Sequence, residues 1–112
     1  MLQEINDDGL LKIIQDFSVL ADTTEKGYIF IQQDDCQTCH KVLEELKTKI
    51  IDKTIYVYTL HRESLANEKI LEFMKCLRLS RTPIICSLPA VCLQINCRVV
   101  ESAKEVEDFV NT

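Results

Sequence analysis

The sequence predicts an α/β domain in which a central mixed sheet of about four strands is flanked by helices. Three observations lead to this fold class. Apolar residues recur with helical spacing in four segments, and β-branched or aromatic runs lie between these segments. The predicted order is helix, strand, helix, strand, helix, strand, strand, helix. A chain of 112 residues can build one core, so residues 1–112 are treated as a single domain.

The N-terminal half is predicted to form two helices with a strand between them. Asn6-Asp7-Asp8 can cap the first helix. The strand runs from Gly27 to Gln32, and the second helix from about Cys36 to Lys49. The expected buried positions of the two helices are Leu10, Leu11, Ile13, Ile14, Phe17, Leu20, Val42, Leu43, Leu46 and Ile50.

The middle of the chain continues the alternation. The segment from Thr54 to Leu60 is β-branched and aromatic, which predicts a central strand. Ser64, with Glu68 nearby, is expected to start a third helix. Its expected buried stripe consists of Leu65, Ile70, Leu71, Phe73, Met74 and Leu77.

The C-terminal part is predicted to form a hairpin and a last helix. Residues 84–95 are strand-like, and Asn96-Cys97 is expected to turn the chain into a strand over residues 98–100. The sequence Ser102-Ala103-Lys104-Glu105 has the form of a capping box for a helix that ends at Val110.

Composition excludes several function classes. The net charge is −5 and no basic cluster occurs, so nucleic acid and anionic membranes are unexpected partners. No apolar run is long enough to span a bilayer. The N-terminus is acidic and lacks the basic and apolar regions of a secretory signal, which predicts a cytoplasmic protein. We also expect the protein to be a monomer. In that compartment most of the six cysteines are expected to be free thiols.

The chemistry is predicted to lie in Cys36-Gln37-Thr38-Cys39, where a strand gives way to a helix. A helix N-terminus offers unpaired N–H groups and a positive dipole, and both stabilise a thiolate on the first cysteine. The second cysteine lies one turn further on and can close a disulfide with the first. The motif therefore indicates thiol–disulfide chemistry.

With this motif and this order of elements, the chain resembles the thioredoxin superfamily over nearly its whole length. The resemblance implies a three-layer thioredoxin-like sandwich and a thiol–disulfide oxidoreductase without metal or organic cofactor. Cys36 would attack a protein disulfide and Cys39 would resolve the mixed disulfide. Substrate-binding residues would be Gln37, Thr38, Leu88 and Pro89. The implied partners are protein disulfides and a reductase or a low-molecular-weight thiol that serves as electron donor.

The family also has a cis-proline at the start of the strand that faces its two cysteines. Two prolines compete for this role here. Pro89 is followed by an apolar strand and a turn, whereas Pro83 follows Thr82 at a more usual distance from Cys39 but leaves no turn. We favour Pro89.

Several residues depart from the family pattern. Asp34-Asp35 stands where thioredoxins have a tryptophan, and Phe30 occupies the position of their buried acid. The two carboxylates oppose the effect of the helix dipole on the pKa of Cys36, but exposed charges act weakly, by about 1 kcal/mol or less. We therefore expect the pKa of Cys36 to be only modestly lowered, which fits a reducing protein better than a strong oxidant.

The cysteines also allow other interpretations. A non-catalytic protein-binding module with the same fold is the main alternative. Cys36 to His40 also matches the haem-attachment pattern C-x-x-C-H, with Met74 as a possible axial ligand. Zinc is disfavoured because Cys92 and Cys97 have poor spacing for a tetrahedral site.

The remaining cysteines lie outside the motif. Cys76 and Cys92 are expected to be small buried hydrophobes. A further disulfide that involves Cys86 stays open at this point.

Overall fold

The fold was determined as a computed structural model and is described for residues 2–19, 27–77, 81–87 and 97–111. The elements are β1 (Leu2–Ile5), α1 (Asp7–Val19), β2 (Tyr28–Gln33), α2 (Gln37–Lys47), β3 (Ile55–Leu60), the 3-10 helix η1 (Arg62–Ala66), α3 (Glu68–Cys76), β4 (Ile84–Ser87), β5 (Cys97–Val99) and α4 (Ala103–Val110).

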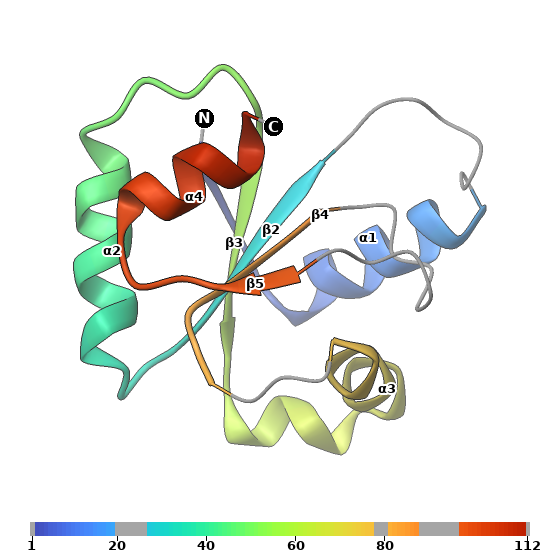
Figure 1. Cartoon of the computed structure of the whole chain (residues 1–112). Helices are drawn as coiled ribbons and strands as arrows, with labels where there is room; N and C mark the ends of the chain where they lie inside the picture. Colours follow the sequence, from blue (N-terminus) through green and yellow to red (C-terminus); the bar gives the residue numbers. More distant parts are fainter. Residues whose placement is uncertain (1, 20–26, 78–80, 88–96, 112) are drawn as a thin grey trace.

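The strands form one open, mixed sheet in the order β1-β3-β2-β4-β5 (Figure 1). The strands β1 and β2 both run parallel to β3, whereas β4 runs antiparallel to β2 and β5 antiparallel to β4. The predicted α/β class and mixed sheet are confirmed. The sheet has five strands rather than about four.

The additional strand is β1, which sequence reasoning left unassigned. Its two central residues, Gln3 and Glu4, are exposed, and only Leu2 and Ile5 are partly covered. The strand lies at the edge of the sheet and pairs only with β3, from Leu2 opposite Ile55 to Ile5 opposite Tyr58. An edge strand of four residues needs few apolar side chains, so its pattern carries little signal.

Helices cover both faces of the sheet (Figure 1). On one face, α1 and α3 contribute Leu10, Ile70 and Phe73 to a buried cluster with Ile29 and Ile31 of β2. On the other face, α2 and α4 bury side chains against the alternate residues of the same strand. This second cluster contains Tyr28, Phe30, Val42, Leu43, Leu46, Val57, Val106 and Phe109. Because successive strand residues point to opposite faces, β2 supplies both cores.

Two predicted helix starts are confirmed by their caps. Asn6 Oδ1 accepts a hydrogen bond from the Gly9 N–H at 2.9 Å, and Ser102 Oγ accepts one from the Glu105 N–H at 3.3 Å. The predicted start of the third helix at Ser64 is wrong. Ser64 lies in η1, and α3 begins after Asn67, whose Oδ1 accepts from the Lys69 and Ile70 N–H groups.

Two further predictions need correction. Helix α2 ends at Lys47, so Ile50 is not on its buried stripe and is 96% exposed. The strand-like segment 84–95 is a strand only at its start, β4, within the described residues; residues 88–96 lie outside them. Cys97 belongs to β5 rather than to a turn. In the described part of the chain, no helix is both long and apolar enough to cross a membrane.

Candidate functional site

The C-x-x-C motif lies where β2 ends and α2 begins. After Gln33 the chain turns through Asp34 and Asp35, and the Cys36 N–H donates to the Gln33 carbonyl at 3.3 Å. Cys36 has extended backbone dihedrals and is the N-cap residue of α2. The sequence-predicted position at a helix N-terminus is therefore confirmed.

Cys36 and Cys39 are joined by a disulfide, with their Cα atoms 5.2 Å apart. The two cysteines differ in exposure. Cys39 is fully buried, whereas Cys36 is partly exposed at the end of the helix. Cys36 is therefore the more accessible of the two cysteines from solvent.

Polar backbone groups surround the sulfur of Cys36. The Cys39 N–H donates to Cys36 Sγ at 3.1 Å, which makes the sulfur itself the cap of α2. Such a donor and the positive end of the helix both favour negative charge on this atom. Cys36 Sγ also lies 3.6 Å from the Thr82 carbonyl oxygen.

Thr82 belongs to the segment that leads into β4. The Thr82–Pro83 peptide bond is cis, and Pro83 is buried immediately before the strand. Thr82 Oγ1 and Gln33 Oε1 are 3.1 Å apart, and the Pro83 carbonyl accepts the Val100 N–H at 3.1 Å. These bonds hold the Thr82 carbonyl against the end of β2.

Among the described residues, the cis-proline beside the two cysteines is Pro83, which follows the Thr82 contact, whereas the sequence favoured Pro89. Local sequence favoured Pro89 because of the apolar run after it. Pro83 lies at the site because the strand that it precedes, β4, pairs antiparallel with β2. The pairing runs from Ile84 opposite Ile31 to Ser87 opposite Tyr28. Leu88 and Pro89 themselves lie outside the described residues.

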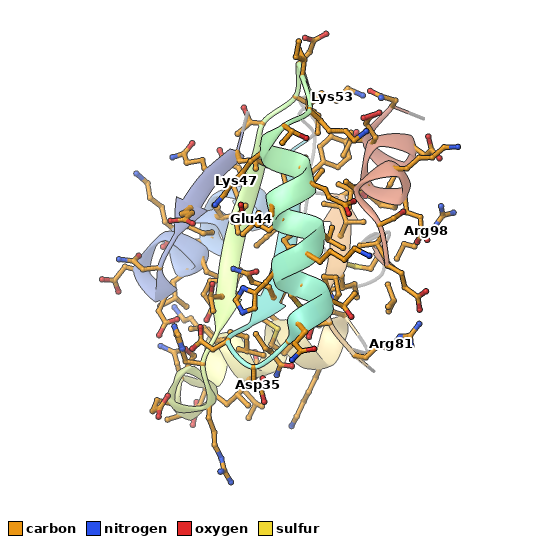
Figure 2. The ribbon with its side chains drawn as sticks, turned by 90° about the vertical axis from the view of Figure 1, so that its left-hand side faces the viewer. Asp35, Glu44, Lys47, Lys53, Arg81 and Arg98 are labelled. Atoms are coloured by element: carbon orange, nitrogen blue, oxygen red, sulfur yellow. A yellow bond between two sulfur atoms is a disulfide. The ribbon has the colours of Figure 1, made fainter. Side chains whose placement is uncertain are left out.

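The other two predicted substrate-binding residues, Gln37 and Thr38, are exposed in the first turn of α2, at the rim of the site. Figure 2 shows Asp35 and Arg81 toward this end of the molecule and Lys53 at the opposite end. Arg81 is ion-paired with Glu101, Nη2 to Oε1 at 2.8 Å. This end of the molecule thus carries both acidic and basic side chains.

Both histidines of the chain contact Asp34. His61 Nδ1 lies 2.8 Å from Asp34 Oδ2, and His40 Nε2 lies 2.8 Å from the Asp34 carbonyl oxygen. The Asp34 side chain is 69% exposed, so its charge is well screened by water. Asp34 therefore has a weak electrostatic effect on Cys36, and its contacts with the two histidines help to fix the turn.

An acidic cavity of about 520 Å³ opens beside this turn, at the carboxyl ends of β1 and β3. It is lined by Glu4, Ile5, Asn6, Asp7, Asp8, Val57, Thr59 and His61. Because His61 also holds Asp34, the cavity adjoins the cysteine site. Its carboxylates favour positively charged groups at this edge of the sheet.

Two polar residues beneath the site were missed by sequence reasoning. Gln32 Nε2 donates to Thr59 Oγ1 at 3.0 Å, and Gln32 is only 7% exposed. The only signal in the sequence is that a buried apolar strand ends in two glutamines. Phe30, at the position where the resemblance implied an acid, is fully buried in the core under α2.

A second disulfide joins Cys86 of β4 to Cys97 of β5, with the Cα atoms 4.1 Å apart. None of the described cysteines is free, so the expectation of mostly free thiols is wrong for them. Cys76 is half-buried rather than a buried hydrophobe. Cys92 lies outside the described residues.

The described residues contain no group of three or more histidine, cysteine or acidic side chains placed to hold a metal ion. Met74, considered above as an axial haem ligand, packs in the core between α3 and the sheet. The motif helix α2 covers the other face. Met74 and His40 are therefore separated by the sheet.

Comparisons with known proteins add nothing to this geometry, because neither the protein-family models nor the curated proteins contain a match to this chain.

Proposed function

We propose that the protein is a thiol–disulfide oxidoreductase with a thioredoxin-like fold, which reduces or exchanges protein disulfides through Cys36 and Cys39. The observation that carries this proposal is the unequal exposure of two bonded cysteines at the N-terminus of α2. The helices on both faces of a mixed sheet and the Thr82 carbonyl beside Cys36 support the thioredoxin-like assignment.

The reaction begins with the dithiol. The Cys36 thiolate attacks one sulfur of a substrate disulfide, and the other substrate sulfur leaves as a thiolate. Cys39, deprotonated, then attacks Cys36 Sγ and releases the second substrate thiol. The substrate gains two electrons, and the protein is left with the Cys36–Cys39 disulfide. A reductase dithiol or a low-molecular-weight thiol returns it to the dithiol.

Each residue of the site has a role in this sequence. The Cys39 N–H and the helix dipole stabilise the Cys36 thiolate before attack and when Cys36 becomes the leaving group. Burial of Cys39 restricts it to the mixed disulfide already formed at Cys36. Thr82 and the exposed Gln37 and Thr38 form the surface against which the substrate rests.

We place this activity in the cytoplasm, where thiol donors for the second half of the reaction are abundant. Structural disulfides are rare in that compartment. The Cys86–Cys97 bond is then expected to survive only if it resists the glutathione pool. Alkylation of cell lysates, followed by peptide mapping of Cys86 and Cys97, measures this, since only a reduced pair is alkylated at both residues.

The proposal is tested by reduction of insulin with dithiothreitol as electron donor. The wild-type protein should accelerate precipitation of the insulin B chain at least tenfold over dithiothreitol alone, and Cys36→Ser should abolish this acceleration. The matched control is Cys97→Ala, which removes a cysteine of the Cys86–Cys97 disulfide and should keep the activity. Equal turbidity with wild type and Cys36→Ser would instead favour the protein-binding module.

A further inference from the structure

The carboxamide of Gln32 is buried, and its oxygen has no hydrogen-bond partner among the described residues. Its Nε2 donates to Thr59 Oγ1, but Gln32 Oε1 has no hydrogen-bond partner. Gln32 is 93% buried. An unpaired buried acceptor costs free energy, and buried polar groups in proteins are rarely left in this state. The amide therefore needs an explanation.

The location of the amide is set by the alternation along β2. Tyr28 and Phe30 face the core under α2, so Gln32, two residues further, faces the same side. The buried residues of α2 are Cys39, Val42, Leu43 and Leu46 in order from its N-terminus. The last three pack in the cluster with Tyr28 and Phe30. Gln32, at the carboxyl end of the strand, therefore lies below the first turn of α2, where Cys39 is buried.

We propose that Gln32 is a positioning residue for the resolving thiol: its Oε1 accepts the S–H of Cys39 in the dithiol state. This inference rests on the function proposed above. Reduction of the disulfide adds two electrons and two protons and creates two S–H donors. The Cys36 thiol already has an acceptor in the Thr82 carbonyl, 3.6 Å from its sulfur. The buried Cys39 thiol needs one as well, and Gln32 offers it.

The consequence is thermodynamic. The disulfide form leaves Gln32 Oε1 unsatisfied, whereas the dithiol form satisfies it. Gln32 thus favours the reduced state and makes the Cys36–Cys39 pair easier to reduce. A variant without the amide loses this bias, so its disulfide should be harder to reduce.

The test compares wild type with Gln32→Leu in glutathione redox buffers. After alkylation, mass spectrometry of the peptide that contains Cys36 and Cys39 gives the reduced fraction of this pair alone. The equilibrium constant for reduction should fall about tenfold in Gln32→Leu, which is ~30 mV toward a more negative potential. A constant within twofold of the wild-type value would overturn the inference.

The matched control is Thr59→Val, which removes the anchor of Nε2 and leaves Oε1 in place. It should destabilise both redox states alike and leave the equilibrium constant unchanged. Urea unfolding of the oxidised and the reduced protein completes the cycle: a merely structural role of Gln32 changes both by the same amount, which would also overturn the inference. If Gln32→Leu fails to fold, Gln32→Met replaces it, since Met is of similar length and lacks the amide.

This result is independent of the outcome with insulin. A shifted equilibrium constant in a protein that does not reduce insulin would keep the inference and reject the proposed function. If the protein reduces insulin but the equilibrium constant does not change in Gln32→Leu, the proposed function stands and the inference is rejected.

Discussion

Tyr58 shows how one buried side chain joins distant parts of this chain. Its hydroxyl donates to Asp7 Oδ1 at 2.6 Å, and Ser64 Oγ donates to the same carboxylate at 2.9 and 3.0 Å. Asp7 is in the first turn of α1, Tyr58 in β3 and Ser64 in η1. Burial, followed by the bond to the Asp7 carboxylate, raises the pKa of Tyr58 to about 12.

The raised pKa predicts a pH dependence of stability. A phenol in an unfolded chain has a pKa near 10, so folding favours the neutral form of Tyr58. Its stabilising contribution is fully present below about pH 10 and is lost as the pH rises toward 12. Tyr58→Phe should lower the free energy of unfolding by about 1–2 kcal/mol at pH 7. In urea unfolding, the gap between wild type and variant should narrow above pH 10; a gap that stays constant would contradict this account.

At the scale of elements, β5 is a short strand that is held in place by its neighbours. It has three residues and pairs with β4 at the edge of the sheet, with Cys86 directly opposite Cys97. The Cys86–Cys97 disulfide and the bond from the Val100 N–H to the Pro83 carbonyl hold it in place. Since Pro83 follows Thr82, the same edge supports the carbonyl beside Cys36.

Loss of this disulfide should therefore destabilise the fold. Cys97→Ala leaves Cys86 as a buried thiol and opens a loop whose ends are 11 positions apart in the sequence. The chain-entropy cost of such a loop predicts a loss of about 3 kcal/mol in the free energy of unfolding. Urea unfolding without reductant measures it. In dithiothreitol the two proteins should unfold at nearly the same urea concentration, and an equal stability without reductant would contradict the prediction.

The elements that sequence predicted well are those with local signals. Helix α4 was predicted with its bounds because Ser102 and Glu105 mark its start, and β3 because its residues are β-branched and aromatic. The start of α3 was misplaced because Ser64 resembles a cap but is bound to Asp7, which is 57 residues away. Local sequence likewise could not show that Pro83 lies beside Cys36, because the pairing of β4 with β2 brings it there.

At the scale of the whole molecule, two cores on either side of one sheet place the site. The strand β2 contributes to both cores and ends at the turn before Cys36, so the two cysteines, at the start of α2, follow a strand that is buried on both faces. The motif alone identified Cys36 and Cys39. The contacts with Thr82, Gln33 and Thr59 could not be predicted, because they arise where β2 meets β4 and β3.

The central claim is that Cys36 attacks and Cys39 resolves. It is tested most directly by trapping the mixed disulfide with insulin, using pre-reduced protein freed of reductant. Cys39→Ser should accumulate a covalent adduct whose peptide map places the bond at Cys36, whereas Cys36→Ser should form none. An adduct that forms equally in both variants, or through a cysteine outside the motif, would contradict the account.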